Sequence, residues 1–279
     1  MDERLHKLLA QHGIGSRRQV EAWITEGRVQ VNGRPAETGQ RVRPGDKIVV
    51  DGRDVTKRLA HEPALQAIVY HKPSGEMLRR QEGDERVGVE TKLPALRSGR
   101  WLSINALGFG EDGLLIFSSD GPLVSSVTRQ AATIPVEYRV RALRPRQSED
   151  WPAIPLEVDV EGEHVTLSAV DRLEGGTTNT WFRVAAERTL PRGAIRALFD
   201  AAGLKVSRTM LVRWGPVTLP RDLPRGRSRD LDVAELDALM LLAGRTRSDA
   251  RPKSRAKSRA KSRAPARPGG RPGRRSGAR

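Results

Sequence analysis

The sequence contains no cysteine, so it can form no disulfide, thiol nucleophile or thiolate zinc site. Nothing in the composition therefore indicates an oxidising compartment. The five histidines are scattered, which argues against metal chemistry, and we expect neither a metal nor a cofactor. No run of about 18 apolar residues is present, and the polar N-terminus does not resemble a signal peptide. We expect a cytoplasmic protein with no membrane segment.

Acidic residues are scarce near the C-terminus. The 279 residues include 50 Lys or Arg and 34 Asp or Glu, which gives a formal charge of +16. Residues 245–279 hold 14 of the basic residues against Asp249 alone, whereas residues 54–244 are close to neutral overall. A basic protein gains free energy by displacing counterions from phosphates. The charge therefore favours a nucleic-acid partner, with an anionic membrane as the second choice.

The segment 245–279 consists almost entirely of Arg, Lys, Ser, Ala, Pro and Gly and contains KSRA three times in succession. Such a segment has no apolar surface to bury, so we expect a disordered basic tail. Its charges can contact RNA phosphates without reading the sequence of bases. The alternative interpretation is a solubilising appendage.

The first sixty residues follow a helix, helix, hairpin pattern. Apolar residues recur at helical spacing from Leu5 to Leu9 and a glycine follows, which predicts a short helix. Ser16, with a glutamine three residues later, forms a capping-box pattern that predicts the start of a second helix. Asn32-Gly33 between alternating valines is a strong hairpin signal.

This unit contains polar residues suited to gripping an RNA backbone. The residues that we expect to bind RNA are Arg4, Lys7, Ser16, Arg17, Arg18, Arg28 and Asn32. The SRR, GRVQVNG and PGDKIVVDG elements occur in order, and the stretch resembles the small RNA-binding domain first seen in the fourth small-subunit ribosomal protein. The resemblance predicts an S-four-like domain over residues 1–60. The alternative is that the arginines form only a solvated helix face.

The middle of the chain, residues 61–244, mixes strand and helix patterns and predicts an α+β domain. The predicted strands are Ile68–Tyr70, Leu114–Ser119, Glu137–Leu143, Val158–Val160, His164–Ala169, Trp181–Ala185, Val206–Trp214 and Val217–Leu219. The predicted helices are Leu123–Gln130, Ala194–Ala202 and Asp232–Leu242.

Three ordered segments resemble the bacterial pseudouridine synthases that modify ribosomal RNA, in the subgroup with an S-four-like domain in front. They are IVYHKPSGEM (68–77), WLSINALGFGEDGLLIFSSDGPL (101–123) and LPRGAIRALFDAAGLKVSRTMLVRWGPVTLPRDLPRG (190–226). The resemblance implies a mixed, largely antiparallel sheet, a monomer, ribosomal RNA as the partner, and isomerisation of uridine to pseudouridine.

The second segment resembles the family's Gly-Arg-Leu-Asp motif followed by GLLLFTTDG. Alignment on GLLIFSSDG (113–121) puts Gly108 at the family's nucleophilic aspartate and Ala106 at the arginine beside it. In the family, this carboxylate is implicated in covalent attack or in proton removal while the uracil is detached, turned and rejoined through carbon five. Glycine has no side chain and can do neither. Glu111 and Asp112 are weak substitutes, three and four residues further on.

The third segment places Arg196 at the family's arginine that pairs with the aspartate, and Ile195 at the apolar residue before it. An unpaired buried charge is costly, so a buried Arg196 is expected to pair with Glu111 or Asp112 instead. Tyr138 falls where the family keeps a tyrosine near the target base, which suits stacking on an extruded uracil. A tyrosine that simply packs in the core is the alternative.

Three side chains of the second segment are interpreted as structural. Ser118-Ser119 and Asp120 follow the apolar strand and are expected to serve the strand end. Three functions remain open: an isomerase, a non-catalytic relative that binds RNA in ribosome assembly, and an RNA chaperone that works through the tail.

Overall fold

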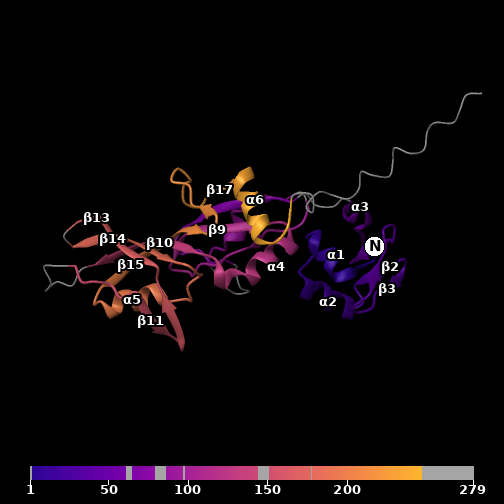
Figure 1. The fold of residues 1–279 in the computed structure, drawn as a ribbon. Coiled ribbons are helices and arrows are strands. Elements are labelled where there is room, and N and C mark those ends of the chain that lie inside the picture. Colours follow the sequence, from indigo (N-terminus) through magenta and orange to yellow (C-terminus); the bar gives the residue numbers. More distant parts are fainter. Residues whose placement is uncertain are drawn as a thin grey trace, which may run out of the picture.

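The computed structural model describes residues 2–60, 65–78, 86–96, 98–143, 151–176 and 178–246. Residues 247–279, almost all of the predicted basic tail, lie outside the described residues. The expectation that the tail is disordered concerns these residues. In Figure 1 the indigo N-terminal unit lies at one end of the molecule, and the strands drawn in orange lie toward the other end.

The N-terminal unit combines three helices with short strands. The helices are α1 Leu5–Gln11, α2 Arg17–Thr25 and α3 Thr56–Leu59. The strands are β1 Glu3–Arg4, β2 Val29–Val31, β3 Arg34–Pro35, β4 Arg41–Val42, β5 Ile48–Val50 and β6 Arg53–Asp54. Strands β3-β2-β5-β6 form one antiparallel sheet, and β1 pairs with β4.

The two sequence signals predicted for this unit are confirmed. The Ser16 hydroxyl accepts the Gln19 backbone N–H at 3.1 Å, and the Gln19 side chain accepts the Ser16 N–H at 2.9 Å, which completes the capping box of α2. Asn32 and Gly33 have φ values of 53° and 81°, the left-handed conformations that a two-residue hairpin turn requires.

The middle of the chain is built on a nine-stranded mixed sheet. Its strands are β7 Ala67–Lys72, β8 Leu102–Ser103, β9 Asp112–Ser118, β10 Val136–Leu143, β13 Ala169–Gly175, β14 Asn179–Ala186, β15 Lys205–Trp214, β16 Val217–Thr218 and β17 Ser228–Asp230. The main order is β13-β14-β10-β15-β9-β7-β17, with β16 paired to β15 and β8 to β9. Among the strand pairings of this sheet in the described residues, only β15–β9 is parallel. The predicted α+β class with a largely antiparallel sheet is confirmed.

Helices and a separate ribbon accompany this sheet. The helices are α4 Gly121–Arg129, α5 Ala194–Ala201 and α6 Val233–Leu242, with 3-10 turns η1 Val89–Thr91 and η2 Ala131–Thr133. Strands β11 Glu157–Val160 and β12 Glu163–Thr166 form a two-stranded ribbon. Within the described ranges, no helix is long and apolar enough to cross a membrane.

Strand β9 runs through the interior of the sheet, and all seven of its residues are buried. Gly113 starts this apolar run with a φ of +114°, and an added Cβ would lie 2.2 Å from the Leu211 carbonyl oxygen. Only glycine allows the backbones of β9 and β15 to come so close in this conformation. The glycine of the GLLIF stretch therefore fixes the parallel junction beside the candidate site.

The buried apolar residues form two clusters. The smaller lies in the N-terminal unit and includes Leu5, Leu9, Val20, Ile24, Val29 and Ile48. The larger lies around the main sheet and includes Tyr70, Leu115, Val140, Phe199, Leu211 and Trp214. Each part of the chain thus has its own core.

Most predicted elements occur where expected, but the strand predicted over His164–Ala169 is wrong as a single element. It divides into β12, which pairs with β11, and the start of β13, which joins the main sheet. Leu167 between them is buried and donates its N–H to the Leu156 carbonyl at 2.7 Å, so the chain changes partners there. Helix α3 and the edge strand β17 were not predicted.

Candidate functional site

A cavity of about 680 Å³ lies in the middle of the chain, where the loop before β9 meets α5 and β15. The residues that line it are Ser103–Glu111, Thr128, Ala131, Tyr138, Thr189–Gly193, Ile195, Arg196, Val206–Thr209, Leu211 and Trp214. The fold therefore brings together Gly108, Glu111, Tyr138, Ile195 and Arg196, which come from the second segment, from β10 and from the third segment.

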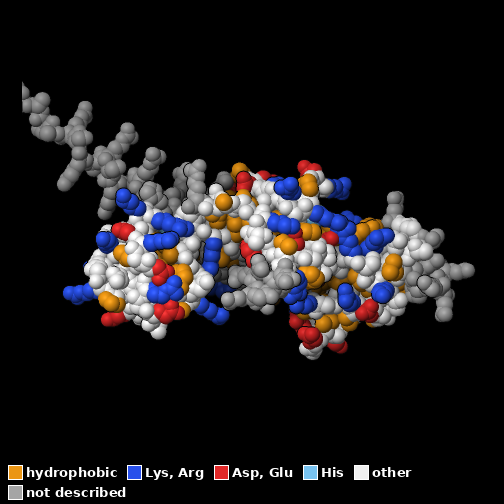
Figure 2. All heavy atoms as spheres, turned by 180° about the vertical axis from the view of Figure 1, so that it is seen from behind, with side chains coloured by type: hydrophobic (Ala, Val, Ile, Leu, Met, Phe, Trp, Pro, Cys, Tyr) orange, Lys and Arg blue, Asp and Glu red, His pale blue; other side chains and the backbone are white. Residues whose placement is uncertain are grey.

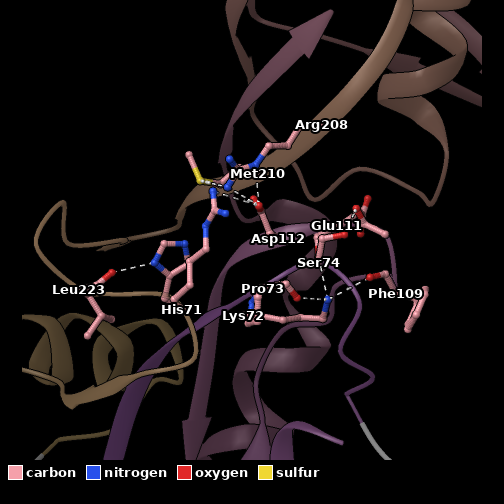
Figure 3. A network of polar contacts seen from close by, with 12 residues as sticks. His71, Lys72, Pro73, Ser74, Phe109, Glu111, Asp112, Arg208, Met210 and Leu223 are labelled. Atoms are coloured by element: carbon pink, nitrogen blue, oxygen red, sulfur yellow. Dashed lines mark hydrogen bonds and ion pairs between the residues drawn. The ribbon is translucent and has the colours of Figure 1, made fainter. Parts of the chain in front are cut away.

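Buried Lys72 holds the loop that carries Gly108. Its ammonium group donates to the carbonyl oxygens of Glu111 at 2.7 Å, Pro73 at 3.1 Å and Phe109 at 3.4 Å (Figure 3). The side chain is fully buried, and burial lowers the pKa of its ammonium group. The Gly75 N–H also donates to the Phe109 carbonyl at 2.9 Å. The KPSG stretch is therefore a clamp on the loop, a role that the sequence did not reveal.

The carboxylate of Glu111 lies beside Gly108. Its Oε2 accepts the Gly108 N–H at 2.6 Å, and the Glu111 N–H returns to the Gly108 carbonyl at 3.2 Å. A Cβ added to Gly108 would lie only 3.1 Å from this Oε2. The substitute carboxylate thus occupies the space into which a side chain at position 108 would extend.

The second possible substitute, Asp112, has a different partner. It is only 2% exposed, does not line the cavity, and accepts the Arg208 Nε–H at 2.6 Å. Arg225 lies 3.9 Å from the same oxygen. Burial raises the pKa of the Asp112 carboxyl, and the Arg208 charge opposes that effect. Asp112 is therefore committed to a buried ion pair that ties β9 to β15 (Figure 3).

The predicted pairing of Arg196 with Glu111 or Asp112 is not found. Arg196 is exposed at the cavity wall, and no ion pair joins it to either acid among the described residues. Its charge is open to solvent, so Arg196 needs no buried partner. The buried carboxylate is neutralised by Arg208, which the sequence did not single out because its partner is 96 residues away in the chain.

Tyr138 contributes an aromatic side chain to the cavity. It lies on β10 opposite Val184 and Leu211 and is 8% exposed. Burial, and secondarily the charge of Glu111, raises the pKa of its phenol, so the ring is neutral at physiological pH. Ile195 on α5 is buried and adds an apolar wall.

Other residues of the second segment serve the scaffold. The Asn105 side chain donates to the Leu114 carbonyl and accepts the Ile116 N–H, both at 2.9 Å. Asp120 accepts the Leu123 N–H at 2.7 Å as the N-cap of α4, and the Ser118 hydroxyl accepts the Asp120 N–H at 3.1 Å. The structural interpretation of Ser118 and Asp120 is confirmed. Ala106, at the position of the family's arginine, is exposed and apolar.

The residues predicted to bind RNA differ in whether their side chains form ion pairs or hydrogen bonds within the described residues. Arg28 is held by Asp51 through two hydrogen bonds of 2.7 and 2.8 Å and by Glu26 at 2.9 Å. Lys7 pairs with Glu3 at 2.9 Å, Ser16 caps α2, and Asn32 bonds Asp46 and Lys47 across the hairpin. Arg4, Arg17 and Arg18 are exposed and form no ion pair among the described residues.

The surface shows how these charges are distributed. In Figure 2, Lys and Arg side chains gather on the N-terminal unit and on the middle of the chain, with acidic side chains among them. Mixed charge of this kind agrees with the near-neutral total of residues 54–244. Arg17 and Arg18, at the start of α2, are exposed cations with no acidic partner among the described residues.

Comparison with known proteins identifies the fold. Residues 3–48 match the S4 domain family. A solved structure of a pseudouridylate synthase is similar over 85% of this chain and 99% of its own, with a TM-score of 0.52 and 20% sequence identity. The fold is therefore that of a pseudouridine synthase with an S-four-like domain at its N-terminus.

Curated relatives define the family more closely. The ribosomal large subunit pseudouridine synthase B of Xanthomonas campestris pv. campestris is 38% identical over 244 residues, which is 86% of this chain and 49% of the relative. The protein of the same name from Escherichia coli is 35% identical over 244 residues, 86% of this chain and 82% of the relative. The chain belongs to this family. It spans only about half the length of several relatives that it matches.

Replacing Lys72 with methionine tests the clamp on the loop. We expect Lys72→Met to lower the free energy of unfolding by about 1–3 kcal/mol, because carbonyl groups lose their donor in a buried place. Hydrogen exchange of the amides of residues 109–111 should also become faster. Lys205→Met, at the exposed start of β15, is the matched control. Equal unfolding free energies for the two variants would contradict the clamp.

The Asp112–Arg208 pair predicts non-additive stability. We expect Arg208→Met to destabilise the fold by about 3–5 kcal/mol, because a buried carboxylate loses its main partner. The double variant Asp112→Asn/Arg208→Met should be less destabilised than Arg208→Met alone. Urea denaturation of the four proteins in this cycle measures the coupling. Additive changes would show that the two side chains act independently.

Proposed function

We propose that this chain binds ribosomal RNA and holds an extruded uridine in its cavity without isomerising it. The observation that carries the proposal is Gly108 at the cavity wall, with the Glu111 carboxylate hydrogen-bonded to its backbone. The proposal places the protein in the cytoplasm, where its RNA partner is found.

RNA binding is supported by the N-terminal unit and by the names of the relatives. Residues 3–48 match the S4 domain, and Arg4, Arg17 and Arg18 present charges without acidic partners among the described residues. The N-terminus of α2, beside Arg17 and Arg18, adds free N–H groups that favour an anion. These features suit phosphates, which position an RNA without reading its bases.

The cavity has the size and lining expected for a base. Its volume lies within the roughly 300–1,000 Å³ of pockets that hold small ligands. Neutral Tyr138 offers a π-surface, and Ile195 offers an apolar contact. A base must leave the stack to enter such a pocket, and stacking on an aromatic ring offsets part of that cost.

The chemistry is where this chain departs from the family pattern. Isomerisation needs a carboxylate placed to within about half an ångström of the working geometry. Gly108 supplies none, and Ala106 supplies no arginine beside it. The Glu111 carboxylate extends from a backbone position three residues further along the chain. One of its oxygens accepts the Gly108 N–H. These features support binding without chemistry.

A second candidate function is isomerisation that uses Glu111 in place of the missing aspartate. It is favoured by one observation, the 3.1 Å between Glu111 Oε2 and a Cβ added at position 108. Glu111 Oε1 makes no hydrogen bond among the described residues, and Glu111 lines the cavity. This second function requires that the Glu111 side chain, which is longer than that of aspartate, reaches the atom of the uridine that the family's aspartate would reach.

Pseudouridine mapping separates the two candidates. Purified protein is incubated with unmodified ribosomal RNA, and pseudouridines are located chemically. We expect no modification by the wild type, which follows from the absent carboxylate. Modification by the wild type that disappears in Glu111→Gln would establish the second candidate and overturn the first.

The same assay can test restoration of the chemistry. Gly108→Asp alone places two carboxylates in contact, so like-charge repulsion disfavours it. Gly108→Asp/Glu111→Gln removes that repulsion and is therefore the variant to compare with the wild type. Activity of the double variant but not of Gly108→Asp would support the placement of Glu111 beside position 108.

The salt dependence of RNA binding tests the N-terminal surface separately. We expect Arg17→Ala/Arg18→Ala to reduce the slope of log K against log salt by about 0.7–0.9 for each phosphate contact that is lost. Arg28→Ala is the comparison, because Asp51 and Glu26 already neutralise that charge, and its slope should change less. Equal slopes for the wild type and the Arg17/Arg18 double variant would exclude this surface from RNA contact.

A further inference from the structure

Phe109 is a solvent-exposed aromatic residue at the cavity. Its side chain is 45% exposed, and no other Trp, Tyr or Phe of the described residues falls in the exposed class. The residue lines the cavity and directly follows Gly108. An exposed ring of this size forgoes a large burial free energy, and such positions commonly mark a binding surface.

The backbone that presents this ring is fixed. The Phe109 carbonyl accepts from Gly75 N–H and from the Lys72 ammonium group, and the Gly108 carbonyl accepts the Glu111 N–H. The ring itself is directed away from Lys72 and the polar contacts around it (Figure 3). A ring with only two rotatable side-chain bonds on a fixed loop loses little entropy when it makes a contact.

One arginine lies beside the ring, and others lie on the wall of the cavity. The Arg86 guanidinium lies 5.1 Å from the ring centroid, a cation–π contact with one face of the ring. Arg192 and Arg196 are exposed and line the same cavity. Aromatic rings interleaved with cations are the pattern that binds unpaired nucleic acid, because the ring stacks on a base and the cations meet the phosphates.

We infer that Phe109 stacks on an unpaired base of the RNA, next to the nucleotide that enters the cavity. The inference rests on the proposed RNA-binding function and adds a second base contact to it. It follows from the place of Phe109 on the cavity wall, one residue from Gly108, and from the exposure of this aromatic residue. Because Ala106 on the same loop is small, Phe109 is the large side chain that this loop offers to RNA. The chemistry recognised is a single-stranded or locally opened RNA segment, since a base inside a duplex has no free face.

The test compares binding of single-stranded and duplex RNA. A short ribosomal RNA fragment that contains 2-aminopurine, and its blunt duplex, are titrated with wild type, Phe109→Ala, Phe109→Trp and Leu241→Ala. Leu241 is the control because it is 78% exposed on α6 and does not line the cavity. Thermal denaturation checks that Phe109→Ala keeps the stability of the wild type, as expected for an exposed ring whose backbone hydrogen bonds remain.

We expect Phe109→Ala to weaken single-strand binding by about fivefold to a hundredfold and to lose quenching of 2-aminopurine fluorescence. Its slope with salt should stay that of the wild type, because no charge is removed. Phe109→Trp and Leu241→Ala should bind as the wild type does, and duplex binding should not depend on residue 109.

Two results would overturn the inference, and they are distinguishable. If the wild type binds the single strand and Phe109→Ala binds it equally tightly, the ring only packs with Arg86, and the proposed RNA-binding function stands. If the wild type binds neither RNA, the proposed function fails and the stacking site fails with it.

Discussion

The buried ammonium group of Lys72 supports the cavity wall, which carries Gly108, Phe109 and Glu111. A cation removed from water is costly unless its donors are satisfied, and Lys72 meets this requirement with the carbonyl oxygens of Pro73, Phe109 and Glu111. Those bonds fix the backbone on both sides of Gly110. Gly108, the ring of Phe109 and the carboxylate of Glu111 are therefore placed by one interaction that comes from β7.

A second buried charge holds the start of β9, directly after Glu111. Asp112 begins β9 in an ion pair with Arg208 of β15, next to the close approach of Gly113 to Leu211. Breaking such a pair leaves an uncompensated buried charge, so the pair fixes the junction of the two strands more than it adds net stability. The end of the loop before β9 is thus held by two buried charges, and the exposed side chains of the loop can face a ligand without loosening the fold.

The sequence predicted the elements well where local chemistry decides them. The capping box of Ser16, the Asn32-Gly33 turn and the apolar run of β9 each depend on neighbours in the chain, and each occurs as expected. It did not predict β17, whose polar residues pair with β7 only through the backbone. The roles of Lys72 and Arg208 also escaped prediction, because Phe109 lies 37 residues from Lys72, Asp112 lies 96 residues from Arg208, and no local pattern marks a buried cation.

At position 108, the candidate site differs from the family pattern by more than the loss of one side chain. The space that an aspartate would need is taken by Glu111, whose carboxylate is bound to the Gly108 N–H. Arg196, which would pair with such an aspartate in the family pattern, is exposed to water and needs no partner. The wall is therefore consistent without a side chain at position 108, because the Gly108 N–H and carbonyl are both hydrogen-bonded to Glu111. Under the proposed function, such a site does without the catalytic carboxylate while it keeps the cavity, the neutral Tyr138 and the exposed Phe109 for contact with a base.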